Sequence, residues 1–551
     1  MASITYSDIS DVDLAADARL VHCRRLGLAG AVTLVVGGVL AGVPPMHDPV
    51  LQQPVLQALR VFVTPSVMVV YVGLCLLMLA WWRLGRLVRS GQGPTMRELL
   101  ITFGWWSAPL LVTMPIFSRD VYSYLAQGTM TVLGVDAYHY GPQVFGGPLA
   151  VDIPTIWQTT PAPYGPVFLS LAADVTSITG ESAWLGVLGM RALALVGIAL
   201  MIFATPRLAR LAGVEERFAV WLGVLNPLVI VHLVGDAHND ALMIGLMMAG
   251  LTLAIERRPA AGAVLVTLAA LVKAPGGLAL IFIVPLWAAQ LSGRARFVRA
   301  ALAAGGIGVA TVVATTELAG TGYGWVSALD TPTLAHTWTS ITTDLGHWSG
   351  VLADALGFAI ADQMLAGWRL AGLAVAGAIC LFMLRKHRAN PAMGVGLGLA
   401  AVLALGPVVH PWYLLWAIVP LAAAATAEKV QRLVIFFSLA MTALVFPGGV
   451  EPSLASALGL VLGVVLVFGT AWAVSNLDRN DLAGSFADAL RRLVRRRFAS
   501  GRGDELEGES VAVYTQSADD PDRHRRDHGV VTERFARMDV RDVHLDERSA
   551  H

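Results

Sequence analysis

The sequence predicts an all-α polytopic membrane protein, a bundle of about 14 transmembrane helices with two long loops on its outer face. Hydrophobic residues make up 56% of the 551 residues and charged residues 14%, with a mean hydropathy of +0.64. These values lie outside the averages of soluble domains. Apolar runs of about 20 residues, long enough to cross a roughly 30 Å hydrocarbon core, recur through residue 474. Basic residues gather in alternate connections between these runs.

The positions of the apolar runs define the expected transmembrane helices. The stretch from Tyr164 to Thr179 is too short, and too closely flanked by Pro and Gly, to be expected to cross. We therefore expect it to be re-entrant or interfacial. The predicted spans are residues 26–44, 61–82, 98–117, 184–204, 216–234, 239–256, 260–273, 275–291, 298–316, 366–384, 393–409, 411–427, 432–447 and 454–474.

Basic residues set the predicted orientation, because connections rich in Lys and Arg stay on the cytoplasmic side of a membrane. In the other connections we count only Arg60, Arg119 and Lys273. Both termini are therefore expected in the cytoplasm, and the two long loops on the outer face of the plasma membrane. The basic connections contain Arg83, Arg86, Arg89 and Arg97; Arg207, Arg210 and Arg217; Arg257 and Arg258; Arg294, Arg296 and Arg299; Arg385, Lys386 and Arg388; and Lys429 and Arg432.

Three segments are predicted along the chain. Residues 1–25 form a cytoplasmic N-terminal segment, and residues 26–476 form the transmembrane domain with outer loops at about 118–183 and 317–365. Residues 477–551 are rich in Asp, Glu and Arg and form a mostly disordered cytoplasmic tail. Within this tail, residues 486–498 predict a basic amphipathic helix that lies on the anionic lipids of the inner leaflet. Because this helix closely follows the last membrane span, nucleic-acid binding is not expected.

Both long loops are rich in aromatic residues. An aromatic ring binds the apolar C–H face of a pyranose, whereas the sugar hydroxyls need donors and acceptors such as His and Asp nearby. These loops therefore predict sugar binding, the alternative being an aromatic belt at the membrane interface. The first loop holds Tyr122, Tyr124, Tyr138, His139, Tyr140, Trp157 and Tyr164, and the second Tyr323, Trp325, His336, Trp338, Asp344, His347 and Trp348.

Asp120 is the most informative residue of the chain. It lies in the segment Phe117-Ser118-Arg119-Asp120-Val121-Tyr122-Ser123-Tyr124, just past an apolar run and at the start of the first outer loop. A carboxylate there is well placed for chemistry at the outer surface. The alternative is a structural carboxylate that pairs with Arg119 or caps a helix.

A second polar group is the hairpin Gly235-Asp236-Ala237-His238-Asn239-Asp240, between two apolar runs. Ionisable side chains held against a membrane need partners, and they usually mark a site or pathway. The alternative is that Asn239 or Asp240 caps the following helix. Such capping is compatible with substrate contact.

A third polar group is His410-Pro411-Trp412-Tyr413, at another outer boundary. A protonated His binds phosphate, although His is also a common structural hydrogen-bond partner. Two rare cations, Lys273 and Arg191, lie near or within apolar spans, where either could hold an anionic phosphate. For Arg191, which lies deeper in its span, pairing with a carboxylate or a carbonyl is the alternative.

Taken together, these motifs resemble a known class of membrane enzyme. Ser118 to Gly128, Ala162-Pro163-Tyr164-Gly165-Pro166, the 235–240 hairpin and His410 to Tyr413 look like those of actinobacterial polyprenol-phosphate-mannose-dependent α-(1→6)-mannopyranosyltransferases. These enzymes are GT-C glycosyltransferases, and the resemblance covers most of residues 60–450. It implies a GT-C-like bundle as the catalytic domain.

The resemblance implies an inverting transfer of mannose from polyprenyl-phosphate mannose. The acceptor is a growing, lipid-anchored α-1,6-mannan, the backbone of lipomannan and lipoarabinomannan. Asp120 is the expected catalytic base, with Asp240 and Asp236 as rivals. The donor phosphate is expected to meet His410, Lys273, Arg191 or Arg119. The residues expected to bind substrate are Arg119, Tyr122, Tyr124, Tyr164, Asp236, His238, Asn239, Asp240, His336, Trp338, His410, Trp412 and Tyr413.

No cofactor is expected. Whether a metal is needed stays open: Asp120, Asp236, Asp240 and Asp344 could supply oxygen ligands for a hard cation, but none is expected to be required. The three cysteines offer no extracellular pair, and no spacing of carboxylates resembles a calcium loop. The main alternative function is a transporter or flippase of a lipid-linked sugar, since many spans and intramembrane ionisable groups suit transport. Against transport, the polar motifs gather on one face and no internal repeat is evident. A structural membrane scaffold would leave the aromatic and His/Asp clusters without a purpose.

Overall fold

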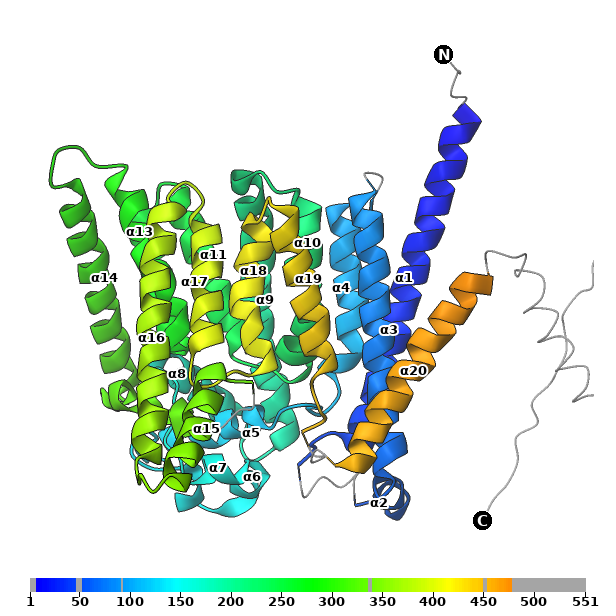
Figure 1. The fold of residues 1–551 in the computed structure, drawn as a ribbon, viewed down its shortest axis with the longest axis horizontal. Coiled ribbons are helices and arrows are strands. Elements are labelled where there is room, and N and C mark those ends of the chain that lie inside the picture. The colour runs from blue at the N-terminus through cyan, green and yellow to red at the C-terminus, as the bar shows by residue number, and fades with distance from the viewer. Residues whose placement is uncertain (1–5, 46–51, 91–92, 335–338, 449–452, 478–551) are drawn as a thin grey trace, which may run out of the picture. The chain divides into compact units, whose positions relative to one another are not determined.

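A computed structural model describes residues 6–45, 52–90, 93–334, 339–448 and 453–477. The described chain is helical, and most of its helices stand side by side as a bundle (Figure 1). These helices are α1 (Tyr6–Ala41), α3 (Val63–Arg89), α4 (Met96–Leu111), α9 (Ala183–Ala212), α10 (Glu216–Gly223), α11 (Asp240–Ile255), α12 (Pro259–Val272), α13 (Ala279–Ala288), α14 (Arg296–Ala319), α16 (Ala361–Lys386), α17 (Pro391–Leu405), α18 (Leu415–Ala424), α19 (Glu428–Ala443) and α20 (Leu454–Leu477).

The apolar helices support the prediction of an all-α membrane protein. By length and composition, five described helices can cross a membrane: the 17–41 part of α1, α3, α9, α14 and α16. A sixth crossing is possible if a broken pair, η2 (Val229–Gly235) and α11, forms one span bent by 111°. Each predicted run overlaps a helix, but the count of about 14 spans stays a prediction.

Several predicted boundaries were wrong because breaks replace continuous helix. The helix expected to reach residue 117 ends at Leu111, so Asp120 does not directly follow a membrane helix. The span expected over 216–234 divides into α10 and the π-helix η2. Pro109 lies inside the last turn of α4, and a proline there removes a backbone donor and favours an early end.

The two long loops contain short helices that lie at the same end of the bundle (Figure 1). The stretch expected to be re-entrant or interfacial is α8, a helix of 14 residues. The helices of the first long loop are α5 (Asp120–Val132), η1 (Pro142–Val144), α6 (Gly147–Asp152), α7 (Thr155–Gln158) and α8 (Pro166–Thr179), and those of the second are η4 (Gly324–Leu334) and α15 (Ile341–Ala355). Three further short helices are α2 (Pro54–Arg60) in the first connection, η3 (Ala274–Leu278) near Lys273 and η5 (Pro411–Leu414) near His410.

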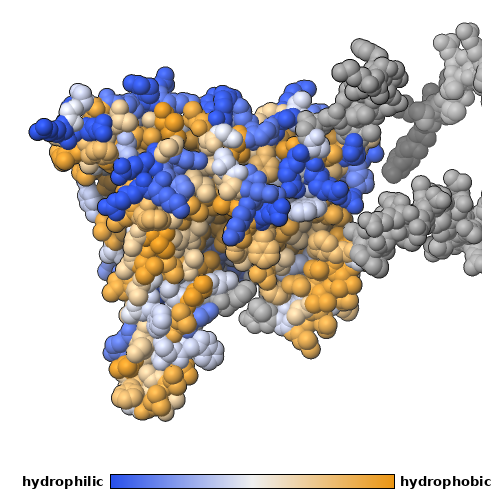
Figure 2. All heavy atoms as spheres, turned by 45° about the horizontal axis from the view of Figure 1, so that its top comes forward, coloured by the Kyte–Doolittle hydropathy of each residue, from blue (hydrophilic) through white to orange (hydrophobic). Residues whose placement is uncertain are grey.

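The surface divides along the bundle axis. Figure 2 shows hydrophilic residues gathered on the end opposite the short helices, above a broad apolar band. Connections at that hydrophilic end include the one between α9 and α10, where Arg210 pairs with Glu216. Large apolar side chains such as Leu302 and Leu370 remain exposed on the outer helices α14 and α16. This distribution is typical of a protein with hydrocarbon around its middle.

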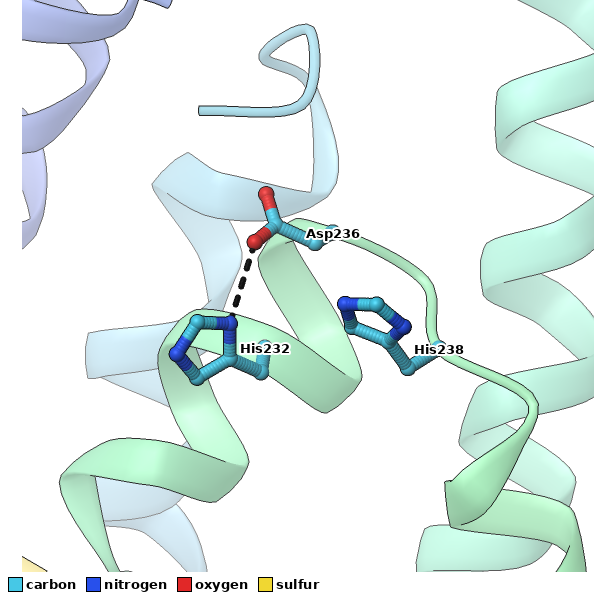
Figure 3. A group of neighbouring side chains, drawn as sticks. All are labelled: His232, Asp236 and His238. Atoms are coloured by element: carbon cyan, nitrogen blue, oxygen red, sulfur yellow. Dashed lines mark hydrogen bonds and ion pairs between the residues drawn. The ribbon is translucent and has the colours of Figure 1, made fainter. Parts of the chain in front are cut away.

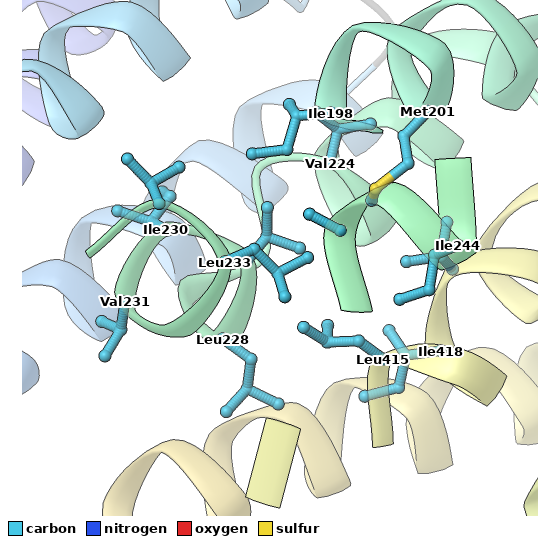
Figure 4. Packing of buried hydrophobic residues seen from close by; sticks show 14 of the residues in the cluster. Ile198, Met201, Val224, Leu228, Ile230, Val231, Leu233, Ile244, Leu415 and Ile418 are labelled. Atoms are coloured by element: carbon cyan, nitrogen blue, oxygen red, sulfur yellow. The ribbon is translucent and has the colours of Figure 1, made fainter. Parts of the chain in front are cut away.

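The broken helix η2 lies in the fully buried core. Leu228, Ile230 and Leu233 are fully buried there. They pack among side chains of α9, α11 and α18, including Ile198, Ile244, Leu415 and Ile418 (Figure 4). The chain therefore turns at η2 inside an apolar environment, where every freed backbone group needs a partner.

Helices α9 and α11 approach so closely that their contact requires glycine. A side-chain carbon on Gly197 would collide with the backbone of Ala241, and one on Gly245 would collide with the backbone of Gly197. Small residues that permit close backbone contact are common between membrane helices. This crossing sets the position of Asp240, the first residue of α11.

We expect Gly197→Ala to destabilise the protein by about 1 to 3 kcal/mol, because the added methyl overpacks the α9–α11 contact. Gly377→Ala in α16 is the matched control, since a side-chain carbon there meets open space. It should be neutral or slightly stabilising, because Ala favours helix over Gly. Thermal unfolding in detergent measures both, and equal unfolding temperatures for the two variants would contradict the packing argument.

Candidate active site

A cavity of about 220 Å³ lies among both long loops and the helices α16, α17 and α18. One part of its lining is polar and the other is apolar. Such a division suits a ligand with a polar head and an apolar tail. Polar and aromatic lining residues are Asp120, Ser123, Gln127, Trp157, Tyr164, Lys273, His410, Tyr413 and Trp416, and apolar ones include Leu329, Leu373, Val402, Leu403 and Val408.

Among the described residues, Asp120 is the carboxylate that lines this cavity. It is the first residue of α5, and its side chain is 22% exposed. The described contacts give no ion pair with Arg119, so that alternative is not observed. Burial raises the pKa of Asp120 to about 6, opposed by the charge of Lys273. The carboxyl group is therefore a stronger base than an ordinary aspartate.

His238 lies against Asp120 from the buried side. Its Nδ1 is 3.6 Å from Asp120 Oδ2 and 3.3 Å from the hydroxyl oxygen of Tyr124. The Tyr124 hydroxyl also lies 3.5 Å from Asn239 Oδ1. All three supporting residues are buried. They thus hold the region behind Asp120 in place without facing the cavity.

Asp240 and Lys273 form a buried ion pair beside the cavity. Lys273 Nζ donates to both carboxylate oxygens of Asp240 at 3.0 Å, and Trp416 Nε1 donates to Oδ1 at 2.6 Å. Asp240 is fully buried, whereas Lys273 reaches the cavity lining. The proposed cap by Asp240 is therefore replaced by an ion pair, and Asn239 occupies the N-cap position without a side-chain cap.

Aromatic rings surround this cation. Lys273 Nζ lies 4.4 Å from the centre of the Tyr413 ring, which stacks on Trp416. His410 stacks on Trp412 with ring centres 4.6 Å apart. Burial lowers the pKa of His410 to about 3, so its imidazole is neutral and offers one hydrogen-bond donor rather than a charge. Lys273 is consequently the cation in the described part of the cavity lining.

The side chains of Asp236 and Arg191 form hydrogen bonds with backbone groups. Asp236 Oδ1 accepts from the N–H groups of Ile116 and Phe117 at 2.8 and 3.2 Å, and Oδ2 faces His232 Nδ1 at 3.1 Å. Arg191 donates to the carbonyls of Leu111, Val234 and Gly235. Both side chains are buried outside the cavity lining. For Arg191 the structure shows the carbonyl alternative.

Other predicted residues lie around or beyond the site. Tyr164 lines the cavity and packs edge-on against Tyr124. Tyr122 is buried and donates its hydroxyl to the carbonyl of Val43 at 2.7 Å, away from the cavity. Arg119 is half-buried and does not line the cavity. His336 and Trp338 lie outside the described residues.

The sequence prediction missed His232 and Trp416. Both lie within apolar runs, and they hydrogen-bond to Asp236 and Asp240, two carboxylates of the predicted polar hairpin. One signal was available for His232, because it precedes Asp236 by four residues and residues four apart share a helix face. Trp416 follows Trp412 at the same spacing.

Two family models match the chain. The N-terminal domain of α-(1→6)-mannopyranosyltransferases matches residues 24–289, and the MptB C-terminal domain matches residues 342–475. The chain belongs to the α-(1→6)-mannopyranosyltransferase family. The predicted family and enzyme class, hexosyltransferase, are thereby confirmed.

Individual relatives agree with the family models. The chain is 35% identical to α-(1→6)-mannopyranosyltransferase B of Corynebacterium glutamicum, over 85% of this chain and 84% of the relative. It is 38% identical to α-(1→6)-mannopyranosyltransferase A of Mycobacterium tuberculosis, over 74% and 80%. No solved structure matches the chain. The similarity thus extends over most of this chain and most of each relative.

We expect Lys273→Met to lower stability by about 3 to 5 kcal/mol, because it leaves the Asp240 carboxylate buried without its cation. Adding Asp240→Asn should recover much of that loss, since the unpaired charge is then removed. Unfolding in detergent of both single variants and the double variant, analysed as a double-mutant cycle, measures the coupling. Additive effects would contradict the ion pair.

Proposed function

We propose that this protein transfers mannose from polyprenyl-phosphate mannose to the 6-hydroxyl of a lipid-anchored α-1,6-mannan. The α-(1→6)-mannopyranosyltransferase family supports mannose as the sugar and the α-1,6 bond as the product. The growing mannan is the backbone of lipomannan and lipoarabinomannan. In this reaction we assign Asp120 as the general base.

The position of Asp120 carries the proposal. Its carboxylate lines the cavity, whereas Asp240 and Asp236 are fully buried and bonded to protein groups. A base must reach the proton that it removes. Asp120 therefore has the access that its two rivals lack.

The proposed step is a single displacement. Asp120 takes the proton of the acceptor 6-hydroxyl while that oxygen bonds to the anomeric carbon. The bond from this carbon to the phosphate oxygen breaks, and its electron pair leaves with the lipid phosphate. One displacement inverts the anomeric carbon, so a β-linked donor gives an α-linked product. No covalent bond to the protein forms.

The leaving phosphate needs fixed positive charge and hydrogen-bond donors. We assign these roles to Lys273, whose ammonium lies at the cavity, and to neutral His410 as a donor. Tyr164 and Tyr413 offer aromatic faces to the sugar. The predicted role of Arg191 in phosphate binding is not proposed again, because its guanidinium is buried against three carbonyls.

The apolar part of the cavity suits the prenyl chain. Leu373 of α16 and Val402 and Leu403 of α17 line it, and α16 also carries exposed apolar side chains such as Leu370. The polar end then lies at the outer face, because the basic connections stay in the cytoplasm. Both termini are proposed to be cytoplasmic.

A transporter or flippase of a lipid-linked sugar is the remaining alternative. Membership of a family of mannosyltransferases favours the enzyme. Purified protein in vesicles distinguishes them: the enzyme forms a new glycosidic bond, whereas a flippase moves the donor between leaflets and leaves it unchanged.

We expect Asp120→Asn to lower the rate of mannose transfer by about 10² to 10⁴, the usual contribution of a positioned base. The amide keeps the shape of the carboxylate but accepts no proton. Transfer of radiolabelled mannose from a polyprenyl donor in membranes, at equal protein level, measures the loss. The exposed Asp174→Asn in α8 is the control, expected to retain normal activity.

Two results decide the assignment. Near-normal turnover of Asp120→Asn would show that another group is the base. A loss of transfer in the Asp174→Asn control as well would mean that removal of a carboxylate acts through expression or folding.

A further inference from the structure

Behind the cavity wall lies a cluster of His232, Asp236 and His238 that the proposed reaction does not use. Each side chain offers one ligand atom, and the three atoms lie within 4.8 Å of one another. Figure 3 shows the two imidazoles and the carboxylate facing a common centre at the turn between η2 and α11. We propose that this cluster binds a divalent transition-metal ion, with Zn²⁺ as its best match.

The ligand set fits zinc chemically. Two imidazoles and one carboxylate form one of the common zinc ligand sets, with a fourth position left for water. In a tetrahedral site with bonds of about 2.0 Å, ligand atoms lie roughly 3.3 Å apart. The separation between His232 Nδ1 and Asp236 Oδ2 is 3.1 Å. The two atoms are joined by a hydrogen bond, and an ion could replace the shared hydrogen with little movement of either ligand.

An unpartnered nitrogen supports a missing ligand. His238 is fully buried, and its Nε2 has no hydrogen-bond partner. Because Nδ1 already faces Tyr124 and Asp120, Nε2 is the nitrogen left for a metal. Buried polar atoms in native proteins are normally bonded.

The surroundings resemble those of a metal site. Asp236 Oδ1 is held by two backbone N–H groups, which leaves Oδ2 toward the cluster. A metal on His238 Nε2 would keep the proton on Nδ1, facing the Asp120 carboxylate and the Tyr124 hydroxyl. Metal-binding histidines usually direct their second N–H at such an acceptor.

The indole ring of Trp412 lies between this cluster and the cavity. Trp412 stacks on His238 with ring centres 4.0 Å apart and lies 5.3 Å from His232. It also stacks on His410, which lines the cavity. The ion would therefore fasten the turn between η2 and α11 rather than meet the sugar. The free energy of binding such an ion adds to the stability of the turn.

The test measures metal content without substrate. Full-length protein with no polyhistidine tag is purified in detergent, loaded with Zn²⁺, washed with a weak chelator and assayed by mass spectrometry. We expect one retained zinc per wild-type chain and loss of that zinc from His232→Gln and His238→Gln. The control His347→Gln, in α15, should keep it. Histidines of residues 478–551 are present in every variant, so they cannot produce the difference.

A second measurement covers variants that fail to fold. Cobalt loaded into the wild-type protein should give the visible absorption bands of a nitrogen- and oxygen-ligated ion, and Asp236→Asn should weaken them. Removing the metal should also lower the unfolding temperature. Folded wild-type protein that retains no zinc and shows no cobalt bands would overturn the proposal, as would unchanged zinc in a folded His238→Gln protein. Neither result bears on Asp120 as the base.

Discussion

The constraint on which the site depends is a chain reversal inside an apolar bundle. Between η2 and α11 the helix axis bends by 111°. Helix α4, which packs against η2, ends at Leu111, before its predicted end at residue 117. Backbone groups freed at such breaks have no water to bond. Arg191 supplies donors to three carbonyls there, and Asp236 accepts from two N–H groups. One buried cation and one buried anion thus stabilise the irregular backbone that supports the cavity.

The same reversal brings the functional groups together. It places Asp240 at the start of α11, where Lys273 from the next helical junction and Trp416 from α18 meet its carboxylate. It also places His238 behind Asp120, which comes from the first long loop. Four separate stretches of the chain therefore determine the geometry of one cavity. The close glycine contact between α9 and α11 adds a second constraint on the start of α11.

Most helices and the three polar motifs could be predicted from the sequence, because hydrophobic periodicity and the length of an apolar run are local properties. The apolar runs indicated the helices, and the motifs containing Asp120, the 235–240 hairpin and His410 were found to adjoin one another in the structure. The partners of the buried charged side chains could not be predicted from the sequence. Nothing in the sequence shows that Lys273 meets Asp240, or that Arg191 meets carbonyls, since these contacts join residues 33 or more positions apart.

The misses have the same origin. His232 lies in the run Val229-Ile230-Val231-His232-Leu233-Val234, which hydropathy assigns to an apolar span. Its place beside His238 depends on the π-helix η2 and on the turn after it, which bring the two imidazoles close together. Helix ends were also misplaced, because hydropathy does not record where a proline and a tertiary hydrogen bond stop a helix.

The Lys273–Asp240 pair has a consequence for product release. Its charges cancel, so the ionised Asp120 leaves the local set of these three residues with one net negative charge. In the proposed step, that charge moves from Asp120 to the departing phosphate as the proton is taken up. When Asp120 later returns its proton to water, two like charges face each other across the cavity. Under the proposed mechanism, their repulsion favours departure of the lipid phosphate, so regeneration of the base promotes release of the spent carrier.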